Sequence, residues 1–340
     1  MSEAILFPGQ GAQFEGMGKD WVEAYPVARE TFQEADEALG LELSKLCWES
    51  GDDVNRTDVA QPGIFTTSVA IIRVLESQGL DRGSAPLTAG LSLGEYTALW
   101  CADALSFQDG LRLVRLRGEA MQDASEQHPS GMVSLMGASE EQATALASVG
   151  AEHGICQVAN LNAPGQIIVS GEFPALDALE AAAKEHGVRR TRRLVVAGGF
   201  HSECMRPAAD RLAAALADVE VRAPKIPVVS NVTARPVSGP DEIRDLLARQ
   251  VCSPVLWEKS VRWAAEQGTT RFLEPGPGTV LAGILRKIDP ELAVRGAARP
   301  GVVAGGVPSA GEKGWDARSL TAVGGAWWGP RPGAIVPACP

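Results

Sequence analysis

The chain of 340 residues is long enough for one large or two modest domains with a substantial core. Its residues are 45% hydrophobic and 21% charged, as in a soluble globular protein, and no apolar run approaches the roughly 20 residues of a membrane-spanning helix. A net charge of -11 argues against a general nucleic-acid binder.

The start of the sequence and its cysteines both favour a cytoplasmic protein. The chain reaches an apolar segment at Ala4 without the basic leader of a secretory signal, so we expect a cytoplasmic location and no membrane partner. The six cysteines are scattered and form no C-x-x-C pair, which argues against zinc and against disulfides. We therefore predict a protein without a metal or other cofactor.

Short apolar strands and helices alternate along residues 1–127. A strand predicted at 4–7 leads into a glycine-containing loop, which lacks both the P-loop ending and the third glycine of the dinucleotide fingerprint. The predicted helices begin near residue 19 and lie at 27–39, 62–78 and 106–125. Pro62 is expected in the first turn of its helix, and Gly79 just beyond the end. This alternation predicts an α/β layer with a parallel sheet.

A serine between two glycines lies where the next strand turns into a helix. Gly90-Leu91-Ser92-Leu93-Gly94 fits G-x-S-x-G, the nucleophile elbow, in which flanking side chains would clash with a sharply turned backbone. At a helix N-terminus, the amide of Leu93 and the helix dipole can stabilise an oxyanion. The alternative is an ordinary strand-to-helix turn in which Ser92 caps the helix.

The predicted order of strands and helices is different between residues 128 and 197. The predicted order is strand 132–136, helix 139–149, strands 155–160 and 166–170, helix 174–186 and strand 188–196. This β-α-β-β-α-β order predicts a small ferredoxin-like subdomain inserted into the larger domain.

The larger domain is expected to resume at residue 198 and to end near 290. The remaining predicted elements are helices at 205–216, 242–252, 255–267 and 280–288 and strands at 226–230 and 271–274. About a third of the residues from 291 to 340 are Gly or Pro, without periodicity, which predicts a disordered tail. The domains are thus 1–127 with 198–290, then 128–197, then the tail 291–340.

A serine nucleophile needs a base, and the chain has only four histidines. His201 alone follows a predicted strand end, where α/β sheets build their sites, and two glycines precede it. The alternative is a loop histidine that caps the next helix. The other three histidines lie in turns or at a helix end: His128, His153 and His186.

Arg117 is a candidate for binding a carboxylate. Its helical spacing turns it away from the stripe that carries Arg112 and Arg115. A guanidinium in a pocket can bind a carboxylate through two parallel hydrogen bonds. A surface position on the helix is the alternative that spacing alone favours.

Several stretches together resemble the malonyl-CoA:acyl carrier protein transacylase family. The matching pieces, in the family's order, are 7–13, 90–95, Arg117-Gly118, 160–171, 199–202, Gln250, 253–255 and 274–278. They extend over about residues 4–288 and exclude the tail. The fold implied is a large α/β-hydrolase-like domain with a parallel sheet core and the inserted ferredoxin-like subdomain.

The resemblance implies a ping-pong transfer of malonyl from malonyl-CoA to the phosphopantetheine thiol of acyl carrier protein. Ser92 would carry the malonyl group as an ester, and His201 would act as base and then as acid. Arg117 would bind the malonyl carboxylate, and the amides of Gln10 and Leu93 would form the oxyanion hole.

The resemblance also assigns residues around this centre. Gln250 would orient His201 through its backbone carbonyl, which explains why no aspartate is needed. Phe200 matches a position that accompanies selection of malonyl over methyl-branched units in polyketide acyltransferases. Asn160 and Asn162 would contact the substrate. Leu91 departs from the histidine that often precedes the serine.

Two other functions compete with malonyl transfer for fatty acid biosynthesis. The first is a serine esterase or thioesterase of the α/β-hydrolase type, which shares G-x-S-x-G. The second is an acyltransferase that serves a polyketide synthase. We expect a monomer in each case.

The densest basic run comprises Arg189, Arg190, Arg192 and Arg193. Because carrier proteins are acidic, we hypothesise that this edge of the small subdomain helps to dock one. The alternative is a solvated edge strand that its charges protect from aggregation.

Overall fold

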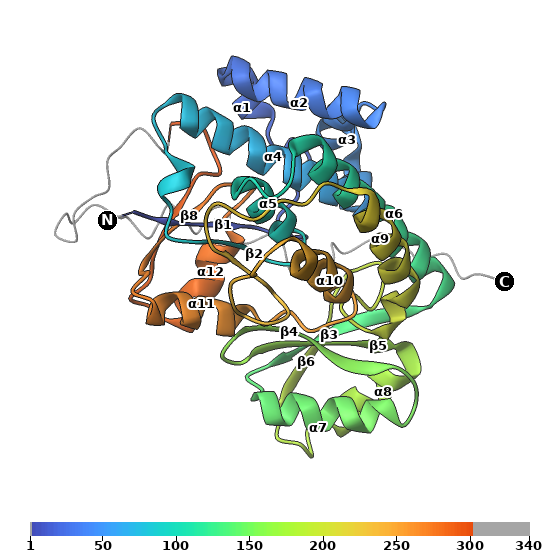
Figure 1. Cartoon of the computed structure of the whole chain (residues 1–340). Coiled ribbons are helices and arrows are strands. Elements are labelled where there is room, and N and C mark those ends of the chain that lie inside the picture. Colours follow the sequence, from blue (N-terminus) through green and yellow to red (C-terminus); the bar gives the residue numbers. More distant parts are fainter. Residues whose placement is uncertain (1, 302–340) are drawn as a thin grey trace. The chain divides into compact units, whose positions relative to one another are not determined.

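The computed structural model describes residues 2–301. The chain divides into two compact units, Met1–Val303 and Ala304–Pro340, and the second lies outside the described residues. The described part is a mixed α/β structure with a parallel sheet and a separate antiparallel sheet (Figure 1). No helix among residues 2–301 is both long and apolar enough to cross a membrane.

Five parallel strands form the larger sheet. In spatial order they are β7 (Val228–Val229), β2 (Thr88–Gly90), β1 (Ala4–Phe7), β8 (Arg271–Glu274) and β9 (Ala293–Gly296). The predicted strand at 4–7 is confirmed residue for residue.

Helices cover both faces of the parallel sheet. They are α1 (Lys19–Ala24), α2 (Pro26–Leu39), α3 (Leu43–Glu49), α4 (Thr57–Ser77), α5 (Gly94–Cys101), α6 (Phe107–Gln127), α9 (Arg206–Asp218), α10 (Pro240–Gln250), α11 (Trp257–Glu266) and α12 (Val280–Ile288). Side chains of β1 alternate between the faces, as the period of a strand requires. Ile5 and Phe7 pack into the core with α4, α5 and α6, whereas Ala4 and Leu6 pack against α11 and α12.

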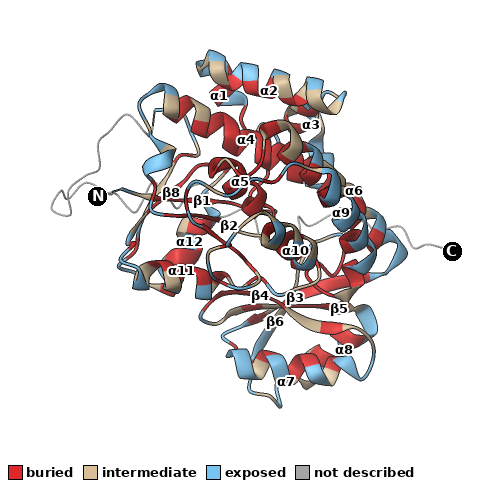
Figure 2. Ribbon diagram, in the orientation of Figure 1, coloured by how far each residue is buried: buried red, intermediate tan, exposed pale blue. Residues whose placement is uncertain are grey.

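The helices α4 and α5 are buried along most of their length (Figure 2). Every residue of α5 is buried, including the polar Glu95 and Thr97, so this helix has no side that faces solvent. The helix that carries the elbow serine at its start is therefore held by core packing on all sides.

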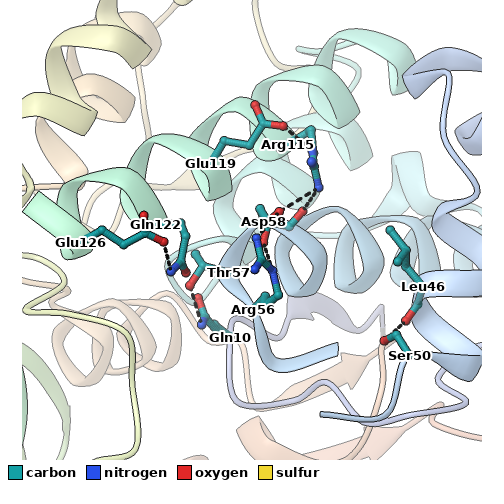
Figure 3. Close-up of polar contacts among 10 residues, drawn as sticks. All are labelled: Gln10, Leu46, Ser50, Arg56, Thr57, Asp58, Arg115, Glu119, Gln122 and Glu126. Carbon is teal, nitrogen blue, oxygen red and sulfur yellow. Dashed lines mark hydrogen bonds and ion pairs between the residues drawn. The ribbon is translucent and has the colours of Figure 1, made fainter. Parts of the chain in front are cut away.

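The prediction that Pro62 starts its helix is wrong, because α4 begins at Thr57 and contains Pro62 in its interior. Proline has no N–H for the carbonyl four residues earlier, which is that of Asp58. Arg115 of α6 donates to this carbonyl from Nη1 at 2.5 Å, so a side chain replaces the missing backbone bond (Figure 3).

The second sheet is antiparallel and lies between α6 and α9 in the sequence. Its strands, in spatial order, are β4 (Cys156–Ala163), β5 (Gln166–Glu172), β3 (Ser130–Met136) and β6 (Arg190–Arg193). Two helices cover one face, α7 (Glu140–Ala151) and α8 (Phe173–Ala182) (Figure 1). The other face contributes Met132 and Ile168 to the main core.

The predicted tail begins later than residue 291. Residues 293–296 form β9, which pairs in parallel with β8 and extends the sheet at that edge. The sequence missed this strand because Ala293–Gly296 contains a charged residue and no apolar run. The rest of the predicted tail, from 302 to 340, lies outside the described residues.

Candidate active site

The turn between β2 and α5 holds Ser92 in a strained conformation. Ser92 has a φ of 53°, in the left-handed region that costs a residue with a side chain about 1–2 kcal/mol. A Cβ on Gly90 would lie 1.9 Å from the backbone carbon of Gly94, and one on Gly94 would lie 2.2 Å from the carbonyl oxygen of Phe7. Only glycine fits at either position, which is why the elbow has both.

The Ser92 hydroxyl contacts His201 and does not cap α5. His201 lies in the loop between β6 and α9 and is 4% exposed. Its Nε2 is 2.8 Å from Ser92 Oγ, and its Nδ1 is 2.9 Å from the carbonyl oxygen of Gln250. The alternatives of a capping serine and a capping histidine are therefore wrong.

The imidazole of His201 is suited to accept a proton. Burial, with a smaller contribution from the nearby Arg117 cation, lowers the pKa of His201 to about 4. In the neutral ring, Nδ1–H donates to the Gln250 carbonyl, which leaves the lone pair of Nε2 for the Ser92 hydroxyl. The backbone carbonyl thus fixes the tautomer that a general base requires.

Arg117 is buried beside the serine, so its surface alternative is wrong. The side chain comes from α6, and its Nη2 donates to Ser92 Oγ and to Gln250 Oε1, both at 3.0 Å. Nη1 donates to Gln61 Oε1 at 2.6 Å, while Nε–H is buried with no partner. No carboxylate among residues 2–301 makes an ion pair with Arg117. Desolvation lowers the pKa of this guanidinium, as expected for a buried cation.

Charged side chains fix the first turn of α4 to α6 (Figure 3). The carboxylate of Asp58 pairs with Arg56 at 3.1 Å and with Arg115 at 3.4 Å. The two helices also approach closely, since a Cβ on Gly118 would lie 2.6 Å from the Thr57 carbonyl oxygen. This contact places Gln61 opposite Arg117.

The loop after β1 brings Gln10 to the elbow. A Cβ on Gly9 would lie 2.2 Å from the carbonyl oxygen of Leu91, so the two backbones touch. The side chain of Gln10 donates to Thr57 Oγ1 at 3.3 Å (Figure 3). The backbone N–H groups of Gln10 and Leu93 donate to no other group of the described residues. Both amides are thus available to an oxyanion.

Three residues of this site were not predicted from the sequence: Gln61, Glu95 and Asn231. Asn231 follows the predicted strand that became β7, so its place at the carboxyl end of a parallel strand was a usable signal. Glu95 and Gln61 are helical positions whose burial depends on tertiary packing alone. Burial raises the pKa of Glu95 to about 7, although hydrogen bonds from Gln250 and Asn231 oppose this.

Phe200, Asn160 and Asn162 are buried, but no hydrogen bond joins them to Ser92. Phe200 is 6% exposed and packs in the main core next to His201. Asn160 bridges to Val255 through the backbone, and Asn162 Oδ1 is buried without a partner. Their predicted contact with substrate therefore stays a prediction.

A cleft of about 420 Å³ opens beside His201. Its lining residues are Glu140, Thr144, Ala147, Ser148 and Ala151 of α7, Cys156, Gln157, Val158 and Leu161 of β4, and His201, Cys252, Pro254 and Leu256. The catalytic base candidate lies at one wall, and mainly apolar groups form the rest. Such a cleft can hold an extended ligand beside His201.

A strained serine, a neutral histidine and two free amides together define an enzyme that forms acyl-serine esters. The model of the acyl transferase domain family matches residues 5–295 of the chain. The chain belongs to this family.

Several relatives are named malonyl CoA-acyl carrier protein transacylases. The chain is 39% identical over 287 residues to the malonyl CoA-acyl carrier protein transacylase of Escherichia coli K12, covering 84% of this chain and 92% of that protein. It is 38% identical over 291 residues to the protein of the same name from Bacillus subtilis, covering 85% and 91%. The predicted resemblance is confirmed, and the hydrolase alternative is not favoured.

Solved structures agree with these relatives. An acyl carrier protein S-malonyltransferase from Vibrio cholerae superposes with a TM-score of 0.84 at 38% identity, covering 88% of this chain and 97% of that one. A malonyl-transacylase in complex with its type II PKS acyl-carrier protein gives 0.84 at 37% identity, covering 89% and 97%.

Proposed function

We propose that this enzyme transfers the malonyl group of malonyl-CoA to the phosphopantetheine thiol of an acyl carrier protein through a malonyl ester of Ser92. The observation that carries the proposal is the buried Arg117, whose Nη2 lies 3.0 Å from Ser92 Oγ and which forms no ion pair with any residue of the described part, 2–301. Its Nε–H has no partner, and one Nη1 hydrogen also remains for an incoming carboxylate. An acyl-CoA that ends in a carboxylate supplies the missing counter-charge.

In the loading step, Ser92 Oγ attacks the thioester carbon while His201 Nε2 takes the hydroxyl proton. The developing oxyanion accepts hydrogen bonds from the amides of Gln10 and Leu93. The C–S bond then breaks, and His201 returns the proton to the departing thiolate of coenzyme A. In the second step, His201 deprotonates the carrier thiol, which attacks the ester, and the proton passes to the Ser92 oxygen as that ester bond breaks.

Intact-protein mass spectrometry tests the proposed function. Mixing the enzyme with malonyl-CoA is expected to add one malonyl group to the wild type and none to Ser92→Ala. Adding holo carrier protein should remove the adduct within the mixing time and yield malonyl-carrier. Discharge to water at the same rate with or without carrier would instead identify a hydrolase.

We propose that the two sheets belong to a ferredoxin-like subdomain and to an α/β-hydrolase-like domain. The antiparallel sheet has the order β6-β3-β5-β4 with α7 and α8 on one face, which supports a ferredoxin-like subdomain at 128–197. The parallel sheet with helices on both faces and a serine elbow after β2 supports an α/β-hydrolase-like domain built from 1–127 and 198–290.

We propose that the carrier serves fatty acid synthesis and that the enzyme acts as a monomer in the cytoplasm without a cofactor. One relative, 39% identical over 291 residues, is a polyketide biosynthesis protein of Burkholderia thailandensis, of which the chain covers 24%. A carrier of polyketide synthesis is therefore the competing partner.

The basic run around β6 is the proposed docking site for the carrier. β6 is an edge strand, paired only with β3, and Arg189 and Arg190 are exposed. Arg193 already binds two carboxylates of the same subdomain: its guanidinium pairs with Asp177 at 2.5 Å and with Glu180 at 2.8 Å. Docking contacts are thus assigned to Arg189 and Arg190, and the ion pairs of Arg193 hold β6 to α8.

Charge reversal tests this docking site. The double variant Arg189→Glu and Arg190→Glu is expected to raise the apparent KM for carrier protein about 10-fold, because two attractive contacts become repulsive. Its rate of loading from malonyl-CoA should not change. Lys45→Glu, an exposed reversal on α3, is the matched control, and α3 lies at the opposite end of the described part from β6 (Figure 1). Equal carrier kinetics in both variants would leave β6 as a charge-protected edge strand.

A further inference from the structure

The side chain of Asn231 binds two backbone groups on the N-terminal side of the elbow serine. Its Oδ1 accepts from the backbone N–H of Ser92 at 2.6 Å, and its Nδ2 donates to the carbonyl oxygen of Gly90 at 2.7 Å. Asn231 has no exposed surface. This planar amide therefore brackets Leu91 and holds the N–H of Ser92, the residue whose φ is 53°.

This amide continues the hydrogen bonding between β7 and β2 beyond the end of both strands. The register pairs Thr88 with Val228 and Ala89 with Val229. After Gly90 the chain turns away into the elbow, so no backbone group of the neighbouring strand can follow it. The Asn231 side chain supplies the donor and the acceptor that a further strand residue would have offered.

The backbone of Asn231 is fixed as firmly as its side chain. Its N–H donates to Glu95 Oε2 at 3.1 Å, and its carbonyl accepts from the N–H of Leu256 at 2.9 Å. The same Glu95 oxygen accepts from Gln250 Nε2 at 2.6 Å, and that amide also donates to the Ser92 carbonyl at 3.0 Å. All four polar groups of Asn231 are thus satisfied, each by a different residue.

The amide of Gln250 has its orientation set by opposite charges. Its Oε1 accepts from Arg117 and its Nε2 donates to Glu95, so a rotation by 180° would bring like partners together at both ends. Glu95 therefore fixes Asn231 on one side and Gln250 on the other, and both amides bind the backbone of Ser92.

We infer that Asn231 is a positioning residue for the reaction, which holds Ser92 in its left-handed conformation so that Oγ meets His201 Nε2. Without this amide, two buried backbone groups of the elbow lose their partners, and the serine can relax toward an ordinary turn. This inference rests on the proposed role of Ser92 as nucleophile. The elbow would then need an amide from the neighbouring strand region in addition to the residues of G-x-S-x-G.

The test compares Asn231→Ala with Thr88→Val. Thr88 is a buried residue of β2 whose hydroxyl donates to the Ile5 carbonyl at 2.9 Å, so its loss removes a buried hydrogen bond from the same sheet without touching the elbow. A fluorophosphonate probe, which phosphonylates an activated serine and releases fluoride, measures Ser92 reactivity without malonyl-CoA. Asn231→Ala is expected to react about 10- to 100-fold more slowly than wild type, because a small displacement of a nucleophile has effects of this size.

Loading from malonyl-CoA should lose the same factor in kcat, with KM within two-fold of wild type. Thr88→Val should lower the melting temperature and keep both rates. Probe rates within two-fold in Asn231→Ala and Thr88→Val would overturn the inference. Failure of the wild type itself to load malonyl would contradict the proposed function and leave the probe comparison valid.

If Asn231→Ala does not fold, Asn231→Asp carries the test. The new carboxyl keeps an acceptor for Ser92 N–H but can donate to the Gly90 carbonyl only when protonated. Its probe rate relative to wild type should rise at least 10-fold from pH 8 to pH 5.5. Arg117 and His201 are common to both proteins. Glu95 accepts from the backbone N–H of residue 231 and would respond to the new carboxylate, so the ratio is also measured with Glu95→Gln in both proteins. A ratio that is low and constant with pH would overturn the inference.

Discussion

Arg117→Ala is expected to lose malonyl loading and to keep acetyl loading. Hydrogen bonds to charged groups contribute about 1.5–3 kcal/mol each, so a carboxylate bound by two of them loses about 10²- to 10⁴-fold in loading rate. Acetyl-CoA has no carboxylate and loses nothing. Removal of a buried cation also leaves an uncharged cavity beside Ser92, so acetyl loading is expected to equal or exceed that of wild type.

A competition experiment between the two thioesters measures how far Arg117→Ala changes the preference for malonyl over acetyl. An equimolar mixture of malonyl-CoA and acetyl-CoA is added, and the ratio of the two Ser92 adducts is read by intact mass. Arg112→Ala is the matched control, because Arg112 is an exposed arginine of the same helix. A parallel loss of both adducts in Arg117→Ala would show that Arg117 supports the site rather than the malonyl carboxylate.

The environment of Arg117 explains why it would prefer an anionic acyl group. Its partners in the structure are the oxygens of Gln61, Gln250 and Ser92, which are dipoles and not charges. Glu95 makes no ion pair with it, although the Glu95 carboxylate, which is bound to Gln250, acts on the charge of Arg117 through space. A buried cation that lacks a direct counter-ion stabilises an incoming carboxylate more strongly than a paired one does.

The elements and the nucleophile were predictable because local rules determine them. The continuous apolar run Ala4–Phe7 fits a strand that is buried on both faces of a sheet, and the two glycines beside Ser92 meet backbone at distances that exclude a Cβ. The same local rules gave a wrong helix start at Pro62. Its helix starts five residues earlier because Arg115, from a different helix, binds the carbonyl that proline leaves free.

The surroundings of the nucleophile were less predictable because they depend on register and packing. Asn231 reaches the elbow only because β7 lies next to β2 in the sheet. The faces of Asn160 and Asn162 depend on two irregularities in the pairing of β4 with β5, which shift the alternation of side chains. Arg193 has the same residue type as Arg190 but is bound by two carboxylates of α8.

His201→Ala is expected to slow malonyl loading by about 10²- to 10⁴-fold, the usual contribution of a general base. The loss should appear in both steps, because the same imidazole serves the serine hydroxyl and the carrier thiol. Binding of malonyl-CoA should persist, since Arg117 keeps its partners Gln61 and Gln250. Single-turnover mass spectrometry measures the rate, and His153→Ala, an exposed histidine, is the control.

The pH dependence of wild-type loading gives a second test of the base. Since the pKa of His201 is lowered to about 4, its imidazole stays neutral at pH 5, and the loss of activity due to its protonation should lie near pH 4. An ordinary exposed histidine would cause that loss near 6.5. Glu95 titrates separately, with a pKa raised to about 7, and Glu95→Gln removes its contribution. A loss of activity around pH 6.5 in the Glu95→Gln enzyme would mean that His201 titrates as a solvated histidine. That result would contradict the buried His201, bound to the Gln250 carbonyl, as the base that acts in the reaction.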